Sequence, residues 1–113
     1  MKLNHLNLTV NDVDATRQFL ETYFHMICVG SRGKSFAAML DDQQFVLTLM
    51  KGKDVHYPAT FHIGFPQDSR AKVDAINKRL KNDGYKVDAP IESHGYTFYV
   101  QAPGGFTIEV LAE

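Results

Sequence analysis

The sequence of 113 residues predicts an α+β fold made of two copies of one βαβββ unit. Apolar and polar residues alternate at the start of each half, which is typical of a strand with one packed face. Each of these strands is followed by a stretch with apolar residues at helical spacing. The same order of elements then repeats with a period of about half the chain, which indicates a duplicated unit.

The first half begins with a strand in LNHLNLTVND, where Leu6, Leu8 and Val10 alternate with polar residues. A helix is expected in NDVDATRQFLETYFHM, where Asn11 or Asp12 can cap the N-terminus. The stretch ICVGSRGKSFAAMLDDQQFVLTLM then predicts short strands separated by turns. The helix is expected to bury a stripe of Val13, Thr16, Leu20 and Phe24, with Phe19 and Tyr23 beside it.

The second half restarts with a strand in TFHIGFP, followed by a helix in QDSRAKVDAINKRLKNDG. Asp68 or Ser69 can cap this helix, and Gly84 is expected to end it. Three further strands are predicted in YKVDAP, YTFYVQ and GFTIEVLAE. The residues expected to be buried are Phe61, Ile63 and Phe65 on the strand and Val73, Ile76 and Leu80 on the helix.

The length indicates one domain of residues 1–113. Within it, module one is expected at 1–51 and module two at 59–113. The polar stretch MKGKDVHYP ends in a proline, which places a linker at 52–58.

The composition excludes several classes of partner. Twelve basic and 13 acidic residues nearly balance, so neither nucleic acid nor an anionic membrane is expected as a partner. The chain has no apolar run long enough to cross a bilayer and no N-terminal signal. The single cysteine, Cys28, excludes an internal disulfide and fits a reducing cytosol. It lies in the apolar stretch MICVG with no base assignable nearby, which favours a structural thiol. A cytoplasmic protein is therefore expected.

Strand alternation places four polar side chains on the face opposite the helices. In the first strand of each half, the packed residues leave His5 and His62 pointing away. In the last strand of each half, FVLTLM and FTIEVL, the same argument leaves Thr48 and Glu109 pointing away. The two histidines occupy equivalent positions of the repeat, and so do Thr48 and Glu109.

Three of these four residues are good metal ligands. A single histidine on a half-exposed strand is usually solvated, and a glutamate near a C-terminus is usually a surface charge. The equivalent positions of His5 and His62, and the apolar neighbours of Glu109, favour a shared site instead. Two imidazoles and one carboxylate suit a divalent ion such as Fe, Mn, Ni, Co or Zn.

The segments HLNLTVNDVDATRQF and FYVQAPGGFTIEV resemble the vicinal oxygen chelate superfamily, and the resemblance covers essentially the whole chain. This superfamily groups glyoxalases, bleomycin-resistance proteins, fosfomycin-modifying thiol transferases and extradiol dioxygenases. Leu20 stands where a tyrosine is common. Residues 102–105, Ala-Pro-Gly-Gly, replace the usual Asp-Pro-Asp-Gly turn. The positions that match the family pattern are His5, Asp12, Thr16, Phe19 and Glu109.

The resemblance implies that the sheets of the two modules form an open, cup-shaped, incomplete barrel around a metal. It also implies a homodimer, with each site built within one chain or from two chains. The metal ligands would be His5, His62 and Glu109. The fourth ligand of glyoxalases, a glutamate, maps onto Thr48, which cannot act as a general base near pH 7. Glyoxalase activity proper is therefore disfavoured.

Other residues are expected to line the site. Strand alternation adds Asn7, Thr97 and Tyr99 to Thr48 as pocket residues. Tyr99 is a candidate catalytic residue that could donate to a bound oxygen, or could equally fill the core. Tyr99 and a metal-bound hydroxide are the candidates for the base. The remaining histidines, His25, His56 and His94, are expected to be surface or loop residues.

The favoured function is a divalent-metal-dependent enzyme that chelates the oxygens of a small molecule, as a lyase, dioxygenase or transferase. The fosfomycin-modifying branch typically continues past its last ligand, and extradiol dioxygenases are usually longer. The alternative is a binding protein of the bleomycin-resistance kind, which would sequester an apolar or planar ligand without catalysis. A dimeric scaffold with a vestigial site is a third interpretation.

Overall fold

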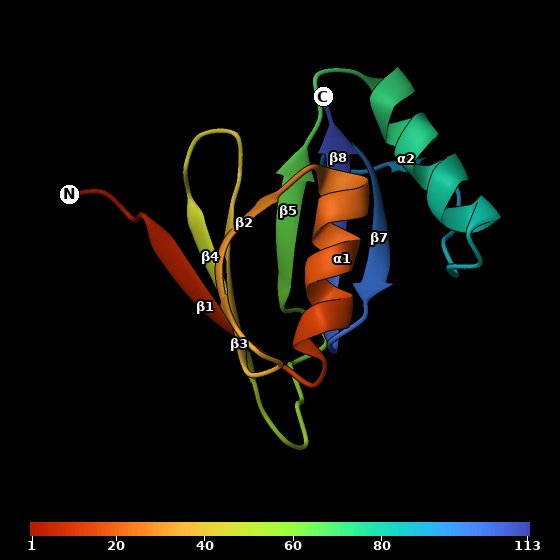
Figure 1. The fold of residues 1–113 in the computed structure, drawn as a ribbon. Coiled ribbons are helices and arrows are strands. Elements are labelled where there is room, and N and C mark those ends of the chain that lie inside the picture. The colour runs from red at the N-terminus through yellow and green to blue at the C-terminus, as the bar shows by residue number, and fades with distance from the viewer. The chain divides into compact units, whose positions relative to one another are not determined.

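The computed structural model describes all residues from 1 to 113 and contains the predicted βαβββ order twice (Figure 1). The first copy consists of β1 (His5–Val10), α1 (Val13–Phe24), β2 (Ile27–Arg32), β3 (Phe36–Leu40) and β4 (Val46–Lys51). The second copy consists of β5 (His62–Pro66), α2 (Arg70–Asn82), β6 (Ile91–Glu92), β7 (Tyr96–Ala102) and β8 (Phe106–Ala112).

Each copy forms one four-stranded mixed sheet. The strand orders are β1-β4-β3-β2 and β5-β8-β7-β6, so the two sheets have the same topology. In each sheet the first strand pairs in parallel with the last, and the other pairs are antiparallel. The α+β fold predicted from the sequence is therefore confirmed.

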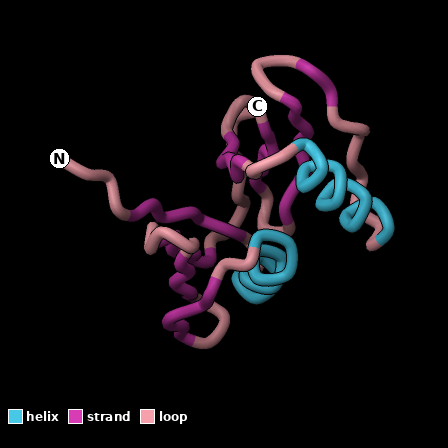
Figure 2. Tube along the Cα trace, turned by 90° about the horizontal axis from the view of Figure 1, so that it is seen from above, coloured by secondary structure: helices cyan, strands magenta, loops and turns pink.

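The chain divides into two compact units. One comprises residues 1–57 and 103–105, and the other comprises residues 58–102 and 106–113. Each contains one helix, drawn in cyan in Figure 2, which packs on the sheet of its own unit. Neither helix is long and apolar enough to span a bilayer.

Helix α1 begins at the predicted cap, because the side chain of Asp12 accepts a hydrogen bond from the backbone N–H of Ala15. The chain leaves the helix at His25, whose φ is 56°. The buried face differs from the prediction at one place, since Tyr23 is buried and Phe24 is only half-buried. The other buried residues of α1 are Val13, Thr16, Phe19 and Leu20, as expected.

Helix α2 is capped by Ser69, which accepts from the backbone N–H of Lys72. Val73 and Leu80 are buried as predicted, but Ile76 is only half-buried. Asn77, the next residue, also lies on the buried face of α2 and is 8% exposed. The hydrophobic pattern alone could not reveal a buried amide.

The predicted strand YKVDAP is wrong, because residues 85–90 form no strand. Asn77 of α2 donates through Nδ2 to the backbone oxygen of Asp88 at 2.9 Å, which ties this segment to the helix. Pro90 has no N–H to give to a sheet. The edge strand β6 follows instead at Ile91–Glu92 and pairs with the start of β7.

The packed faces of the strands follow the predicted alternation in direction, but the predicted burial is incomplete near the edge strands β1 and β5. Leu6 is 37% exposed, and Phe61, Ile63 and Phe65 are only half-buried. Leu8 and Val10 on β1 and Leu47 and Leu49 on β4 are buried, whereas Thr48 lies on the other face. On β8 the buried apolar residues include Phe106, Ile108 and Val110.

The turn between β7 and β8 belongs to the first unit. The backbone oxygen of Gly104 accepts from the N–H of Asn11 at 3.3 Å. The hydroxyl of Thr16 lies 2.7 Å from the backbone oxygen of Pro103 and 2.6 Å from that of Asp12. The hydroxyl of Thr16 and the backbone of Asn11 thus hold a turn that lacks the usual aspartates.

Candidate metal centre

Glu109 is the centre of a polar cluster in the second unit. It lies on β8, between Gly64 of β5 and Tyr99 of β7 in the strand register. Its exposure is only 5%, although it points away from the apolar core. A carboxylate at this depth requires hydrogen-bond donors or a cation.

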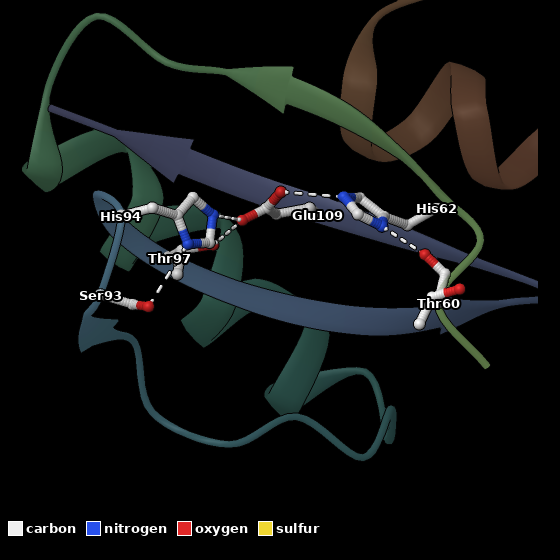
Figure 3. Close-up of polar contacts among 6 residues, drawn as sticks. All are labelled: Thr60, His62, Ser93, His94, Thr97 and Glu109. Carbon is white, nitrogen blue, oxygen red and sulfur yellow. Dashed lines mark hydrogen bonds and ion pairs between the residues drawn. The ribbon is translucent and has the colours of Figure 1, made fainter.

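The two carboxylate oxygens of Glu109 have different neighbours (Figure 3). Oε2 lies 2.6 Å from the hydroxyl of Thr97, which donates to it, and 2.5 Å from Nε2 of His94. Oε1 lies 3.3 Å from Nε2 of His62. Burial raises the pKa of Glu109, but hydrogen bonds from Thr97, His94 and Tyr99 outweigh this effect and leave the pKa below its ordinary value. The carboxylate is therefore ionised at neutral pH.

A hydrogen bond from Nδ1 fixes the orientation of the His62 ring. Nδ1 lies 2.9 Å from the backbone oxygen of Thr60. Because a carbonyl oxygen can only accept, Nδ1 carries the proton. In its neutral form, His62 therefore presents the lone pair of Nε2 to the Glu109 carboxylate, which is the arrangement of a metal-binding histidine.

Tyr99 lies beside these two residues. Its ring meets the ring of His62 edge-on, with centroids 5.6 Å apart, and it is 44% exposed. Partial burial, followed by its hydrogen bond to Glu109, raises the pKa of Tyr99. The phenol is therefore protonated at neutral pH and can donate a hydrogen bond, but it is a poor base.

The first unit places the other predicted residues on the corresponding face of its sheet. Nδ1 of His5 lies 2.8 Å from the amide oxygen of Asn4, so its Nε2 also carries the lone pair. The hydroxyl of Thr48 donates to the amide oxygen of Asn7 at 2.7 Å. Neither Thr48 nor Asn7 can take a proton near pH 7.

The two sheets share one register at these positions. Thr48 pairs with Asn7 and Ala38, just as Glu109 pairs with Gly64 and Tyr99. The repeat read from the sequence is therefore present in the strand pairing. His5 occupies in the first sheet the place that His62 occupies in the second.

The second unit brings together two predicted ligands, His62 and Glu109, with the predicted pocket residues Thr97 and Tyr99. His5 lies in the first unit. The structure contains no group of three His, Cys, Asp or Glu side chains that could hold one metal ion.

His94 is the member of the cluster that sequence reasoning did not include. It lies in the short connection between β6 and β7 and is a loop residue, as expected. Its ring nevertheless reaches the Glu109 carboxylate. Alternation fixes side-chain direction on strands only, so the sequence offered no signal beyond the closeness of His94 to the start of β7.

The chain belongs to the Glyoxalase/Bleomycin resistance protein/Dioxygenase superfamily, whose profile matches residues 2–110. The family predicted from the two terminal motifs is therefore confirmed. A curated relative, the uncharacterized protein PA2024 of Pseudomonas aeruginosa, is 32% identical over an alignment that covers 95% of this chain and 85% of the relative.

Solved structures agree with this assignment. A possible glyoxalase from Bacillus cereus is 61% identical, with a TM-score of 0.95 and 98% of each chain covered. A variant of the fosfomycin resistance protein FosX from Listeria monocytogenes, complexed with Mn(II) and 1S,2S-dihydroxypropylphosphonic acid, is 22% identical. Its TM-score is 0.85, and the match covers 99% of this chain and 92% of FosX, which shows a shared fold.

Proposed function

We propose that this chain is a divalent-metal-dependent enzyme that acts on a small oxygenated molecule. The observation that carries the proposal is the contact between Nε2 of His62 and Oε1 of Glu109, at 3.3 Å. Because Nδ1 of His62 donates to a carbonyl, the neutral form of the ring turns the lone pair of Nε2 toward an anionic oxygen. Two acceptors in this position require a cation between them, either a proton or a metal ion.

The donor set fits a metal ion. Ligand atoms about 2.0–2.2 Å from one ion lie roughly 2.8–3.1 Å from each other in octahedral geometry and roughly 3.3–3.6 Å in tetrahedral geometry. The separation of 3.3 Å between the two atoms falls in the tetrahedral range. An imidazole nitrogen and a carboxylate oxygen suit Fe, Mn, Ni, Co or Zn.

His5 is the proposed third ligand. Its ring has the same tautomer as that of His62, and it stands at the equivalent position of the repeated register. His5 would reach the site either from the same chain or from a second copy of the chain. We propose a homodimer, because β1 and β5 are edge strands, and unpaired edges favour association. The single cysteine is consistent with a cytoplasmic location.

A bound ion would polarise the substrate's oxygens and stabilise negative charge that develops on them. The chain's own contribution is hydrogen bonding and orientation. Tyr99 is protonated and can donate to a substrate oxygen near the ligands. Thr48 stands where glyoxalases have a glutamate. Its hydroxyl is hydrogen-bonded to Asn7 and cannot act as a base. These features favour a lyase, dioxygenase or transferase over a glyoxalase proper.

The complex of the FosX variant supports both halves of the proposal. It contains Mn(II) and a ligand whose two hydroxyl groups are on adjacent carbons. A related fold can therefore hold a metal with a vicinally oxygenated molecule. Mn(II) is accordingly the first ion to test.

The test is calorimetric titration of the tag-free, metal-free protein with Mn(II). We expect one ion per His5–His62–Glu109 set. We also expect His62→Ala to weaken binding more than about 100-fold, beyond the range typical of outer-shell partners. His56→Ala is the matched control, because His56 is exposed and lies outside the site. Equal affinity of His62→Ala and the parent would contradict the proposal. A parent that binds no metal but takes up an apolar ligand would favour the sequestering protein instead.

A further inference from the structure

His94 contacts the same carboxylate as His62 but from the opposite side (Figure 3). Its Nε2 lies 2.5 Å from Oε2 of Glu109, an oxygen that the hydroxyl of Thr97 also contacts at 2.6 Å. Its side chain is 52% exposed, whereas that of Glu109 is 6% exposed. An exposed loop residue therefore reaches in to a buried anion.

The tautomers of the two histidines differ. His62 donates from Nδ1 to the backbone oxygen of Thr60 and keeps the lone pair on Nε2. Nδ1 of His94 instead faces the hydroxyl of Ser93 at 3.3 Å, a group that can donate to it. Because the ionised carboxylate of Glu109 can only accept, Nε2 of His94 carries the proton and donates to Oε2, and Nδ1 can accept from Ser93. A protonated Nε2 cannot ligate a metal.

We propose that His94 is a positioning residue that holds Glu109 by Oε2 and thereby directs Oε1 to the metal. The inference rests on the metal site proposed above. His94 and Thr97 together supply two donors to Oε2, and charge-assisted hydrogen bonds of this kind are strong and short. Oε1 lies 3.3 Å from Nε2 of His62 and is the proposed ligand atom. Glu109 thus binds the ion through one oxygen, and His94 is not a ligand.

The first test uses the metal-free parent protein. Nitrogen-15 NMR of the imidazole rings at about pH 9, above the ordinary histidine pKa, reports which nitrogen carries the proton. We expect the proton on Nδ1 of His62 and of His5, but on Nε2 of His94. A spectrum in which Nε2 of His94 lacks the proton would overturn the inference.

The second test is the Mn(II) affinity of variants. His94→Ala removes a hydrogen-bond partner of a ligand, so we expect binding to weaken about 10–100-fold. His94→Gln keeps an N–H donor of similar reach and should restore most of that loss, which a merely structural role would not produce. Thr97→Val, which removes the other donor to Oε2, should weaken binding as His94→Ala does. His56→Ala should match the parent.

The outcomes separate this inference from the proposed function. Equal affinity of His94→Ala and the parent would overturn the role of His94 and leave the metal site intact. If His94→Ala lost as much affinity as His62→Ala, and His94→Gln did not restore it, His94 would be a ligand. That result would also overturn the positioning role. A parent that binds no Mn(II) would contradict the proposed function, and the NMR spectrum would still decide the orientation of His94.

Discussion

Gly104→Ala and Gly105→Ala form a matched pair that tests how the turn before Glu109's strand is held. Both glycines have positive φ, 112° and 99°, so either alanine is strained by about 1–2 kcal/mol. Only Gly104 is also enclosed. A Cβ there would approach within 3.2 Å of the Val10 side chain and clash outright with the hydroxyl of Thr16. At Gly105 the nearest atoms would be 3.8 Å away.

The difference between the two variants isolates the clash. Any gain from restricting the unfolded chain is the same in both and cancels. We expect Gly104→Ala to lower the free energy of unfolding by about 1–3 kcal/mol more than Gly105→Ala, the usual cost of overpacking. Urea unfolding followed by circular dichroism measures both values. Equal losses for the two variants would refute the packing of Thr16 against this turn.

A double-mutant cycle refines the comparison. Thr16→Ala removes the hydroxyl that the new methyl group would strike. The cost of Gly104→Ala should therefore be smaller in the Thr16→Ala background than in the parent, with a coupling of about 0.5–3 kcal/mol. Strictly additive effects would show that another contact causes the loss.

Three further predictions concern the carboxylate, the missing ligand and the buried amide. The pKa of Glu109 is lowered from 4.5 in the fold, so its ionised form adds stability that is present above pH 4.5 and lost as the pH falls through the folded pKa. In metal-free protein, urea midpoints of Glu109→Gln should therefore fall less on acidification than those of the parent; parallel curves would argue against the donors around Glu109. Thr48→Glu should bind Mn(II) more tightly, because it adds a carboxylate at the position equivalent to Glu109; calorimetry that finds unchanged affinity would contradict the shared register of the site. Asn77→Ala should lower the free energy of unfolding by about 1–3 kcal/mol, because it leaves the backbone oxygen of Asp88 without its donor; a loss below about 0.5 kcal/mol would show that water replaces the amide.

Most of the fold could be predicted because strand alternation and helical spacing report which side chains are buried. The repeat added a second, independent check, since both halves have to place corresponding residues on the same face. The strand prediction failed where factors other than side-chain burial determine the structure. Residues 85–90 alternate like a strand, yet the hydrogen bond from Asn77 and the proline at position 90 keep them out of the sheet.

The candidate site was predictable to the extent that its residues lie on strands. His62, Thr97, Tyr99 and Glu109 all point where alternation places them. His94 was not predicted as a site residue, because a loop gives no periodic signal for side-chain direction. The tautomers that distinguish a ligand from a donor depend on the hydrogen-bond partners of both ring nitrogens, which the sequence does not specify.

A crystal structure of the tag-free protein soaked in Mn(II) would show whether Oε1 of Glu109 and Nε2 of His62 share one metal ion. Anomalous scattering locates the ion independently of the protein atoms. We expect a peak within bonding distance of these two atoms and of Nε2 of His5, from the same chain or from a second one. A peak elsewhere, or none at a concentration that saturates the protein in solution, would contradict it.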